Sequence, residues 1–235
     1  MMRRRRRVWR VRFLPPGPYG SDPAPAGWTF LLVTVFWYLV VETVFGKETF
    51  GLLRAGALYP PLVEHGQWFR ILSTMFVHVS LWHILVNMIS LWTLFVVEQA
   101  LSTPVFIAIY IISGAVGSLL TLPISPDQVS AGASGAIFGL FGAMLALALL
   151  GLFPPAVRNQ LLMVLGINVV IDLMNLGTIG WMAHLGGLAT GMALTYAFVK
   201  WLRNARFWTV LAWICSLACG LSLVWDLATP LPLSW

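Results

Sequence analysis

The chain has 235 residues, of which 59% are hydrophobic and only 9% are charged, and its mean hydropathy is +0.86. Soluble domains carry about a quarter charged residues, so this composition excludes an ordinary soluble protein and indicates that lipid surrounds most of a single domain. The net charge is +6, and seven of the 14 Lys and Arg lie in residues 1–12. Beside several apolar segments, such a run is better explained by the positive-inside rule than by nucleic-acid binding, so we expect no nucleic-acid partner.

The N-terminal region is predicted to be a basic cytoplasmic tail followed by a linker, together residues 1–27. Residues 13–27 hold five prolines and three glycines, which favour turns and loops. The apolar run at residues 28–45 is too long for the core of a cleavable signal peptide and is expected to be the first membrane span. A mitochondrial transit peptide is the alternative for the Arg-rich start, although the run lacks serine. We therefore expect a bacterial cytoplasmic membrane, with an organelle left open.

Residues 46–79 are moderately apolar but interrupted by five glycines and prolines. These helix-breaking residues are too frequent for the segment to form a membrane span. They are expected to form either a loop outside the membrane or a partly immersed loop packed against helices, because irregular backbone at membrane depth must be satisfied by protein.

Six further apolar segments complete an all-α polytopic membrane protein with seven predicted spans. With the N-terminus inside, eleven of the 14 Lys and Arg lie on the inner side, in agreement with the positive-inside rule. Cys215 and Cys219 are expected to be small packing residues, and no metal or organic cofactor is expected. The segments are residues 80–97, 104–122, 134–153, 156–172, 180–199 and 207–227.

Ser134 opens the fourth span within the sequence Gly132-Ala133-Ser134-Gly135. It could be a small residue that allows helices to pack closely, or a nucleophile. The two interpretations are compatible, because small residues recur at every fourth position on the fourth and sixth spans, and facing ridges would bring Ser134 close to His184. The ridges comprise Gly135, Gly139 and Ala143 on one span, and Ala183, Gly187 and Gly191 on the other.

His184 lies near the start of the sixth span, at the same predicted depth as Ser134. It could be a buried structural histidine or the general base that a serine nucleophile requires. No carboxylate is evident to orient its ring, since Asp127 lies in a loop and Asp172 ends the fifth span. The sequence therefore predicts a Ser-His dyad rather than a triad.

His83 and Asn87 are four residues apart and share one face of the second span. They could be a polar pair that joins helices, or donors to the oxyanion formed during acyl transfer. The backbone N–H of Ser134, at a helix start, is the third expected donor.

These motifs together resemble the rhomboid intramembrane serine proteases. The resemblance rests on His83-x-x-x-Asn87, Gly132-x-Ser134-Gly135 and Ala183-His184-x-x-Gly187-x-x-x-Gly191, in that order, and it covers about residues 28–200. It implies a six-span catalytic core over residues 28–200, followed by an extra C-terminal span and short tail over residues 201–235.

The resemblance also implies the residue roles: Ser134 as nucleophile, His184 as base, and His83, Asn87 and the Ser134 amide as the oxyanion site. Residues 46–79 would be a half-immersed first loop containing Arg70. The family usually has Trp immediately before this Arg, whereas this chain has Trp68-Phe69-Arg70. The implied activity is cleavage of transmembrane or juxtamembrane segments of membrane proteins near the outer face. Residues 175–180 are expected to be a mobile cap over the site.

Other functions are less well supported by the sequence. A zinc protease would need His-Glu-x-x-His, which is absent, and an aspartyl protease would need two aspartates within spans. A soluble hydrolase would need Gly-x-Ser-x-Gly between a strand and a helix. A transporter would be expected to have broken helices at mid-depth. The rival from another class is a catalytically inactive rhomboid-like protein that binds membrane helices. The substrate and the oligomeric state are left open.

Overall fold

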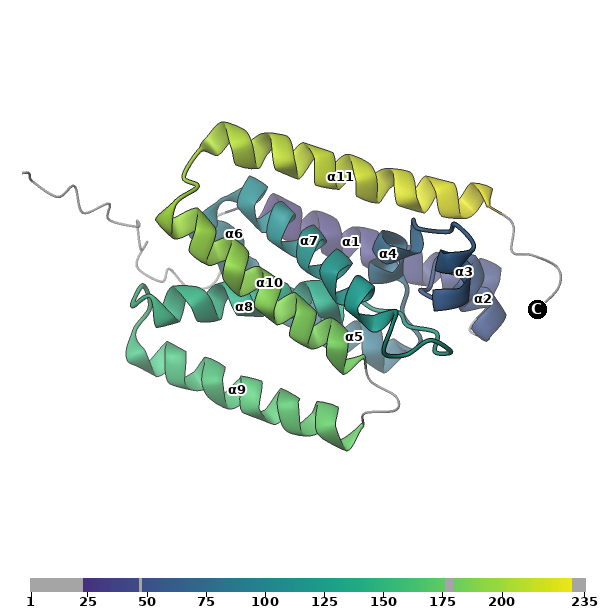
Figure 1. Cartoon of the computed structure of the whole chain (residues 1–235), viewed down its shortest axis with the longest axis horizontal. Coiled ribbons are helices and arrows are strands. Elements are labelled where there is room, and N and C mark those ends of the chain that lie inside the picture. The colour runs from purple at the N-terminus through teal and green to yellow at the C-terminus, as the bar shows by residue number, and fades with distance from the viewer. Residues whose placement is uncertain (1–22, 47, 176–179, 230–235) are drawn as a thin grey trace, which may run out of the picture.

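The computed structural model describes residues 23–46, 48–175 and 180–229, and this part of the chain is almost entirely helical (Figure 1). The N-terminal basic run and most of the expected cap, residues 176–179, lie outside the described residues. The helices are α1 (Pro25–Val40) with a π-helical end (Val41–Phe45), α2 (Thr49–Arg54), α3 (Pro60–Glu64), α4 (Arg70–Ser73) with a 3₁₀ turn (Thr74–Phe76), α5 (Leu81–Thr93), α6 (Phe95–Leu101), α7 (Thr103–Thr121), α8 (Ser134–Leu149), α9 (Pro155–Met174), α10 (Trp181–Lys200) and α11 (Ala205–Ala228).

The protein is a polytopic helical membrane protein. Within the described residues, six helical segments are long and apolar enough to cross a bilayer: α1 with its π-helical end, α5 with α6, α7, α9, α10 and α11. The eighth helix is also apolar but has only 16 residues. The seven-span topology thus stays a prediction. The fifth predicted segment, thought to be short, forms the 20-residue helix α9.

The bundle is built around α8 and α10, which pack against each other and against α7. The flanking helices lie on opposite sides: α11 packs on α7 and α4, and α9 packs on α8 (Figure 1). Of the residues of α9, only Leu161 is buried, so α9 is the most loosely held of the long helices.

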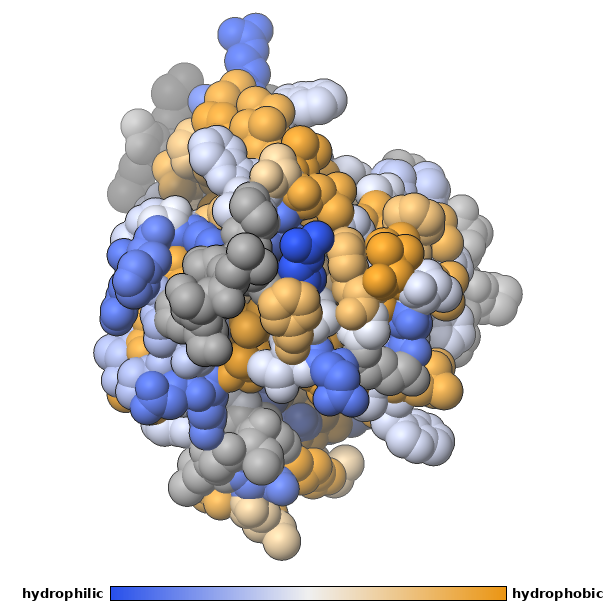
Figure 2. Space-filling view, turned by 90° about the vertical axis from the view of Figure 1, so that its right-hand side faces the viewer, coloured by the Kyte–Doolittle hydropathy of each residue, from blue (hydrophilic) through white to orange (hydrophobic). Residues whose placement is uncertain are grey.

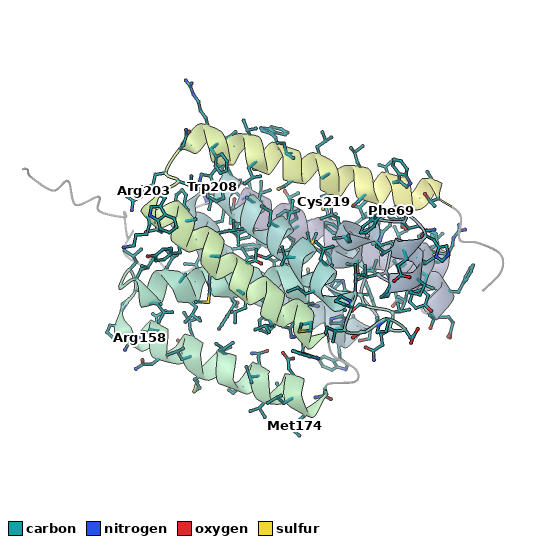
Figure 3. The ribbon with its side chains drawn as sticks, viewed as in Figure 1. Phe69, Arg158, Met174, Arg203, Trp208 and Cys219 are labelled. Carbon is teal, nitrogen blue, oxygen red and sulfur yellow. The ribbon has the colours of Figure 1, made fainter. Side chains whose placement is uncertain are left out.

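The segment at residues 46–79 folds into α2, α3 and α4 at one end of the bundle, where Figure 2 shows hydrophilic side chains among hydrophobic ones. Arg70 organises this segment from a buried position. Its guanidinium donates hydrogen bonds to the Leu53 and Ala57 carbonyls at 2.7 and 2.8 Å and to Gln67 Oε1 at 2.7 Å. Arg158 and Arg203 lie at the opposite end of the bundle from Phe69 and Met174 (Figure 3).

The first helix begins at Pro25, so residues 25–27 are helical and their assignment to the linker is wrong. The cause is Glu98, whose buried carboxylate accepts hydrogen bonds from the N–H groups of Ala26 and Gly27 at 3.2 and 2.9 Å. A carboxylate at a helix N-terminus satisfies free N–H groups and favours helix initiation there. This cap comes from about 70 residues away in the sequence.

The helix α8 is short for a membrane span, because sixteen residues extend about 24 Å whereas a hydrocarbon core is about 30 Å thick. Protein groups satisfy the non-helical backbone before Ser134. The first loop does this: Leu58 and Ser130 exchange backbone hydrogen bonds of 2.8 Å in each direction, and the Gly132 N–H donates to the Thr74 carbonyl at 3.1 Å.

Candidate active site

Ser134 and His184 lie at the N-terminal ends of neighbouring helices, α8 and α10. The Ser134 hydroxyl is 2.9 Å from His184 Nε2, which is hydrogen-bond distance between a nucleophile and a base. The structure brings together two residues that are 50 positions apart in the sequence.

Close packing of α8 and α10 sets this distance. A Cβ atom added at Gly187 would overlap the carbonyl oxygen of Gly135, and one added at Gly191 would overlap the carbonyl oxygen of Gly139. Gly139 also lies against the side chain of Ser113 in α7. Only glycine allows two helix backbones to approach so closely.

The ring of His184 is held on both its face and its far edge. Phe138, one turn after Ser134, stacks on the imidazole with ring centroids 4.2 Å apart and an interplanar angle of 10°. His184 Nδ1 lies 3.0 Å from both carboxylate oxygens of Asp172, in the last turn of α9. The expectation that no carboxylate orients His184 is therefore wrong, because α9 extends far enough to carry Asp172 to the start of α10.

His83, Asn87 and Gly132 form a polar cradle beside Ser134. His83 Nδ1 and Asn87 Nδ2 are buried and have no hydrogen-bond partner among the described residues. Gly132 has φ +133°, and a Cβ built on it would lie 2.9 Å from His83 Nε2 and 3.7 Å from Asn87 Nδ2. The absence of a side chain at Gly132 therefore allows the His83 ring to lie against this backbone. The Ser134 N–H stands at the helix start, where N–H groups lack intrahelical acceptors.

Comparisons with known proteins identify the family of this chain. The family model described as "Rhomboid domain" matches residues 65–201, which is more than half of the chain. The chain belongs to the rhomboid family. It is 32% identical over 200 residues to the rhomboid protease GluP of Bacillus subtilis, covering 78% of this chain and 38% of that protein.

Two relatives from Toxoplasma gondii are similar over more of their own length. Rhomboid-like protease 3 is 30% identical over 179 residues, covering 74% of this chain and 68% of the relative. Rhomboid-like protease 1 is 31% identical over 203 residues, covering 83% of this chain and 68% of the relative. The chain thus spans less than half of the Bacillus rhomboid and about two thirds of each Toxoplasma rhomboid.

A crevice of about 350 Å³ lies on the bundle one turn beyond Ser134 along α8. It lies between α5 and α9 with α8 as its floor, and Phe138, the residue stacked on His184, is part of its lining. Most of the lining is apolar, and the polar groups in it are Ser90, Thr93, Gln160 and Asn168.

Sequence reasoning did not assign a role to His78, which is buried under the cradle. Its Nδ1 faces the Phe76 carbonyl at 3.3 Å, its Nε2 accepts from the Ala133 N–H at 3.5 Å, and its ring lies 5.0 Å from that of His83. Burial lowers the pKa of His78 to about 3, and the nearby His83 adds to this effect. His78 is therefore neutral, with its proton on Nδ1, and it positions the backbone just before Ser134.

Two other residues could have been found from sequence signals. Asp172 is an acidic group at the edge of an apolar segment, where it is costly without a partner. Phe138 is four residues after Ser134 and hence on the same face of the helix.

Proposed function

We propose that this rhomboid protein is a serine endopeptidase that cleaves transmembrane or juxtamembrane segments of other membrane proteins. The observation that carries the proposal is the 2.9 Å contact between Ser134 Oγ and His184 Nε2 beside a cradle of buried polar groups. The names of its relatives, rhomboid protease and rhomboid-like protease, support the same activity.

The reaction begins when His184 Nε2 takes the Ser134 hydroxyl proton and the Ser134 oxygen attacks the scissile carbonyl carbon. The carbonyl oxygen becomes an oxyanion, stabilised by donors from His83, Asn87 and the Ser134 N–H. As the C–N bond breaks, His184 returns the proton to the leaving amine. Water, deprotonated by His184, then attacks the acyl-enzyme, and the Ser134 oxygen leaves and recovers its proton.

The crevice between α5 and α9 supports a membrane segment as substrate. A helical segment hides its amides in hydrogen bonds, so it must unwind locally before Ser134 can attack. Glycine, proline and other poor helix formers near the cleaved bond should therefore favour cleavage.

We further propose that the N-terminus lies in the cytoplasm of a bacterial cell and that the site opens toward the outer face. Arg158 and Arg203 lie at the same end of the bundle, away from Phe69, which supports one orientation by the positive-inside rule (Figure 3). The seven-span topology predicts that a topology reporter fused after Trp235 lies outside the cell. A reporter found in the cytoplasm would mean that the chain has one span fewer.

The activity is tested with the purified full chain in liposomes that contain a labelled single-span protein. The parent is expected to cleave it and to react with a fluorophosphonate at Ser134, whereas Ser134→Ala and His184→Ala abolish both. Equal cleavage by these variants would overturn the mechanism. A parent that binds the single-span protein but neither cleaves it nor reacts with the fluorophosphonate would instead be an inactive helix-binding protein.

A further inference from the structure

The contact between Asp172 and His184 is additional to the Ser-His dyad that the family resemblance implies. Both carboxylate oxygens lie 3.0 Å from Nδ1, while Nε2 of the same ring faces Ser134 at 2.9 Å. Asp172 and His184 are mostly shielded from solvent, with side-chain exposures of 16% and 12%. Since a carboxylate only accepts hydrogen bonds, Nδ1 carries the proton and Nε2 is free to accept one from Ser134.

The position of Asp172 is unfavourable without this contact. It lies in the last turn of α9, where the helix dipole disfavours a negative charge, and that turn contains no basic residue. A carboxylate at the edge of the hydrocarbon region is also costly unless it is paired. His184 is its hydrogen-bond partner, so the local cost is offset by an interaction across two helices.

The position of His184 is unfavourable for its charged form. It lies in the first turn of α10, where the positive end of the helix dipole disfavours the imidazolium that forms each time Ser134 gives up its proton. Phe138 fixes the plane of the ring but supplies no charge. A carboxylate at Nδ1 is the group that both fixes the tautomer and stabilises the charged ring.

We propose that Asp172 is a positioning residue that holds His184 in the Nδ1-protonated tautomer and stabilises its imidazolium during catalysis. The proposal rests on the proposed serine protease function and deepens it. Asp172 acts through His184 and does not touch the reacting atoms.

This arrangement also makes the base depend on α9. Leu161 is the one buried residue of that helix, so little packing holds its far end near α10.

The test compares Asp172→Asn and Asp172→Ala with the matched control Asp127→Asn, in which an exposed carboxylate of the loop before α8 is changed in the same way. We expect kcat for a single-span substrate to fall by about 10²-fold or more in both Asp172 variants, because the ring loses its preferred tautomer and charge partner. KM and the thermal unfolding midpoint are expected to stay close to the parent values. The Asp127 control is expected to match the parent throughout.

NMR spectroscopy can test the Asp172–His184 contact without measuring turnover, because it reports the tautomer of the His184 ring. In full-length protein labelled with ¹⁵N-histidine, the His184 signals are assigned by their loss in His184→Ala. They should show an Nδ1–H tautomer in the parent and a changed tautomer mixture in Asp172→Ala.

Unchanged kcat in the Asp172 variants, or a loss of kcat accompanied by a matching loss of thermal stability, would overturn the positioning role. So would an unchanged tautomer in Asp172→Ala. A parent whose Ser134 never reacts would instead overturn the proposed protease function, and the tautomer measurement would still decide whether Asp172 orients His184.

Discussion

Gly187 of α10 packs against the carbonyl oxygen of Gly135 in α8 so closely that even a methyl group at position 187 would overlap that oxygen. The next turn repeats the arrangement with Gly191 and Gly139. Because Ser134 and His184 lie at the ends of these same helices, the glycine contacts and the 2.9 Å distance from Ser134 Oγ to His184 Nε2 are one geometric relationship.

The first prediction concerns Gly187→Ala. The added methyl must push α10 away from α8, which should cost about 1–3 kcal/mol of unfolding free energy. A displacement of the base by about 1 Å should lower kcat by about 10²-fold. Thermal unfolding and cleavage assays measure the two effects. Gly220→Ala in α11 is the control, since a Cβ there meets nothing within 4 Å. Parent-like activity in Gly187→Ala would contradict the argument.

The second prediction concerns Gly132→Ala. A side chain here both strains a backbone with φ +133° and fills the space beside His83 and Asn87. We expect kcat to fall by about 10²–10³-fold, comparable to removal of one oxyanion donor. Gly151→Ala is the matched control, because Gly151 also has a positive φ of +74° but no neighbours within 4 Å of its Cβ position. If both variants lose activity equally, backbone strain rather than the cradle is responsible.

The third prediction concerns Arg70. Burial lowers its pKa to about 10, with Asp226 acting in the opposite direction, so its guanidinium stays charged at neutral pH. Arg70→Ala leaves two backbone carbonyls without their donor and removes the cation beside Asp226 of α11. The expected loss is about 3–5 kcal/mol of unfolding free energy. Arg54→Ala, at an exposed position of the same loop, should lose much less in a denaturation experiment.

The fourth prediction is a pH dependence of stability that comes from His78. Its pKa of about 3 in the folded protein is below the usual 6.5, so the unfolded chain binds the proton first as the pH falls. The contribution of neutral His78 to the free energy of unfolding is therefore fully present above about pH 6.5. It decreases toward pH 3, with a slope approaching about 1.4 kcal/mol per pH unit. Unfolding midpoints between pH 7 and 4 should fall less steeply for His78→Gln than for the parent. The exposed His65→Gln variant should keep the parent slope.

Short-range periodicity predicts a large part of this fold, because apolar helices and small residues at every fourth position are visible along the sequence. The proximity of Ser134 and His184 follows from the two glycine ridges. Asp172 stands out in the sequence as an acidic residue that needs a partner, but the identity of that partner does not, because it depends on how far α9 extends and where it leans. The start of α1 at Pro25 likewise depends on Glu98, which is remote in sequence.

The end of α8 shows a second limit of sequence reasoning. Residues 150–153 continue the apolar run, yet the helix ends at Leu149 and the chain turns through Gly151 with φ +74°. Apolarity alone does not distinguish a helical residue from one that turns at the membrane edge.

The crevice between α5 and α9 implies a competition between substrate and solvent. In a bilayer, the solvent of such a crevice is hydrocarbon, and lipid tails are as apolar as leucine side chains. An entering segment exchanges one set of apolar contacts for another and gains little from burial itself. Selection would then depend on shape and on the few polar groups at Ser90, Gln160 and Asn168. On the proposed protease function, lipids whose tails fit the crevice well would act as inhibitors, so membrane composition would tune the rate of cleavage.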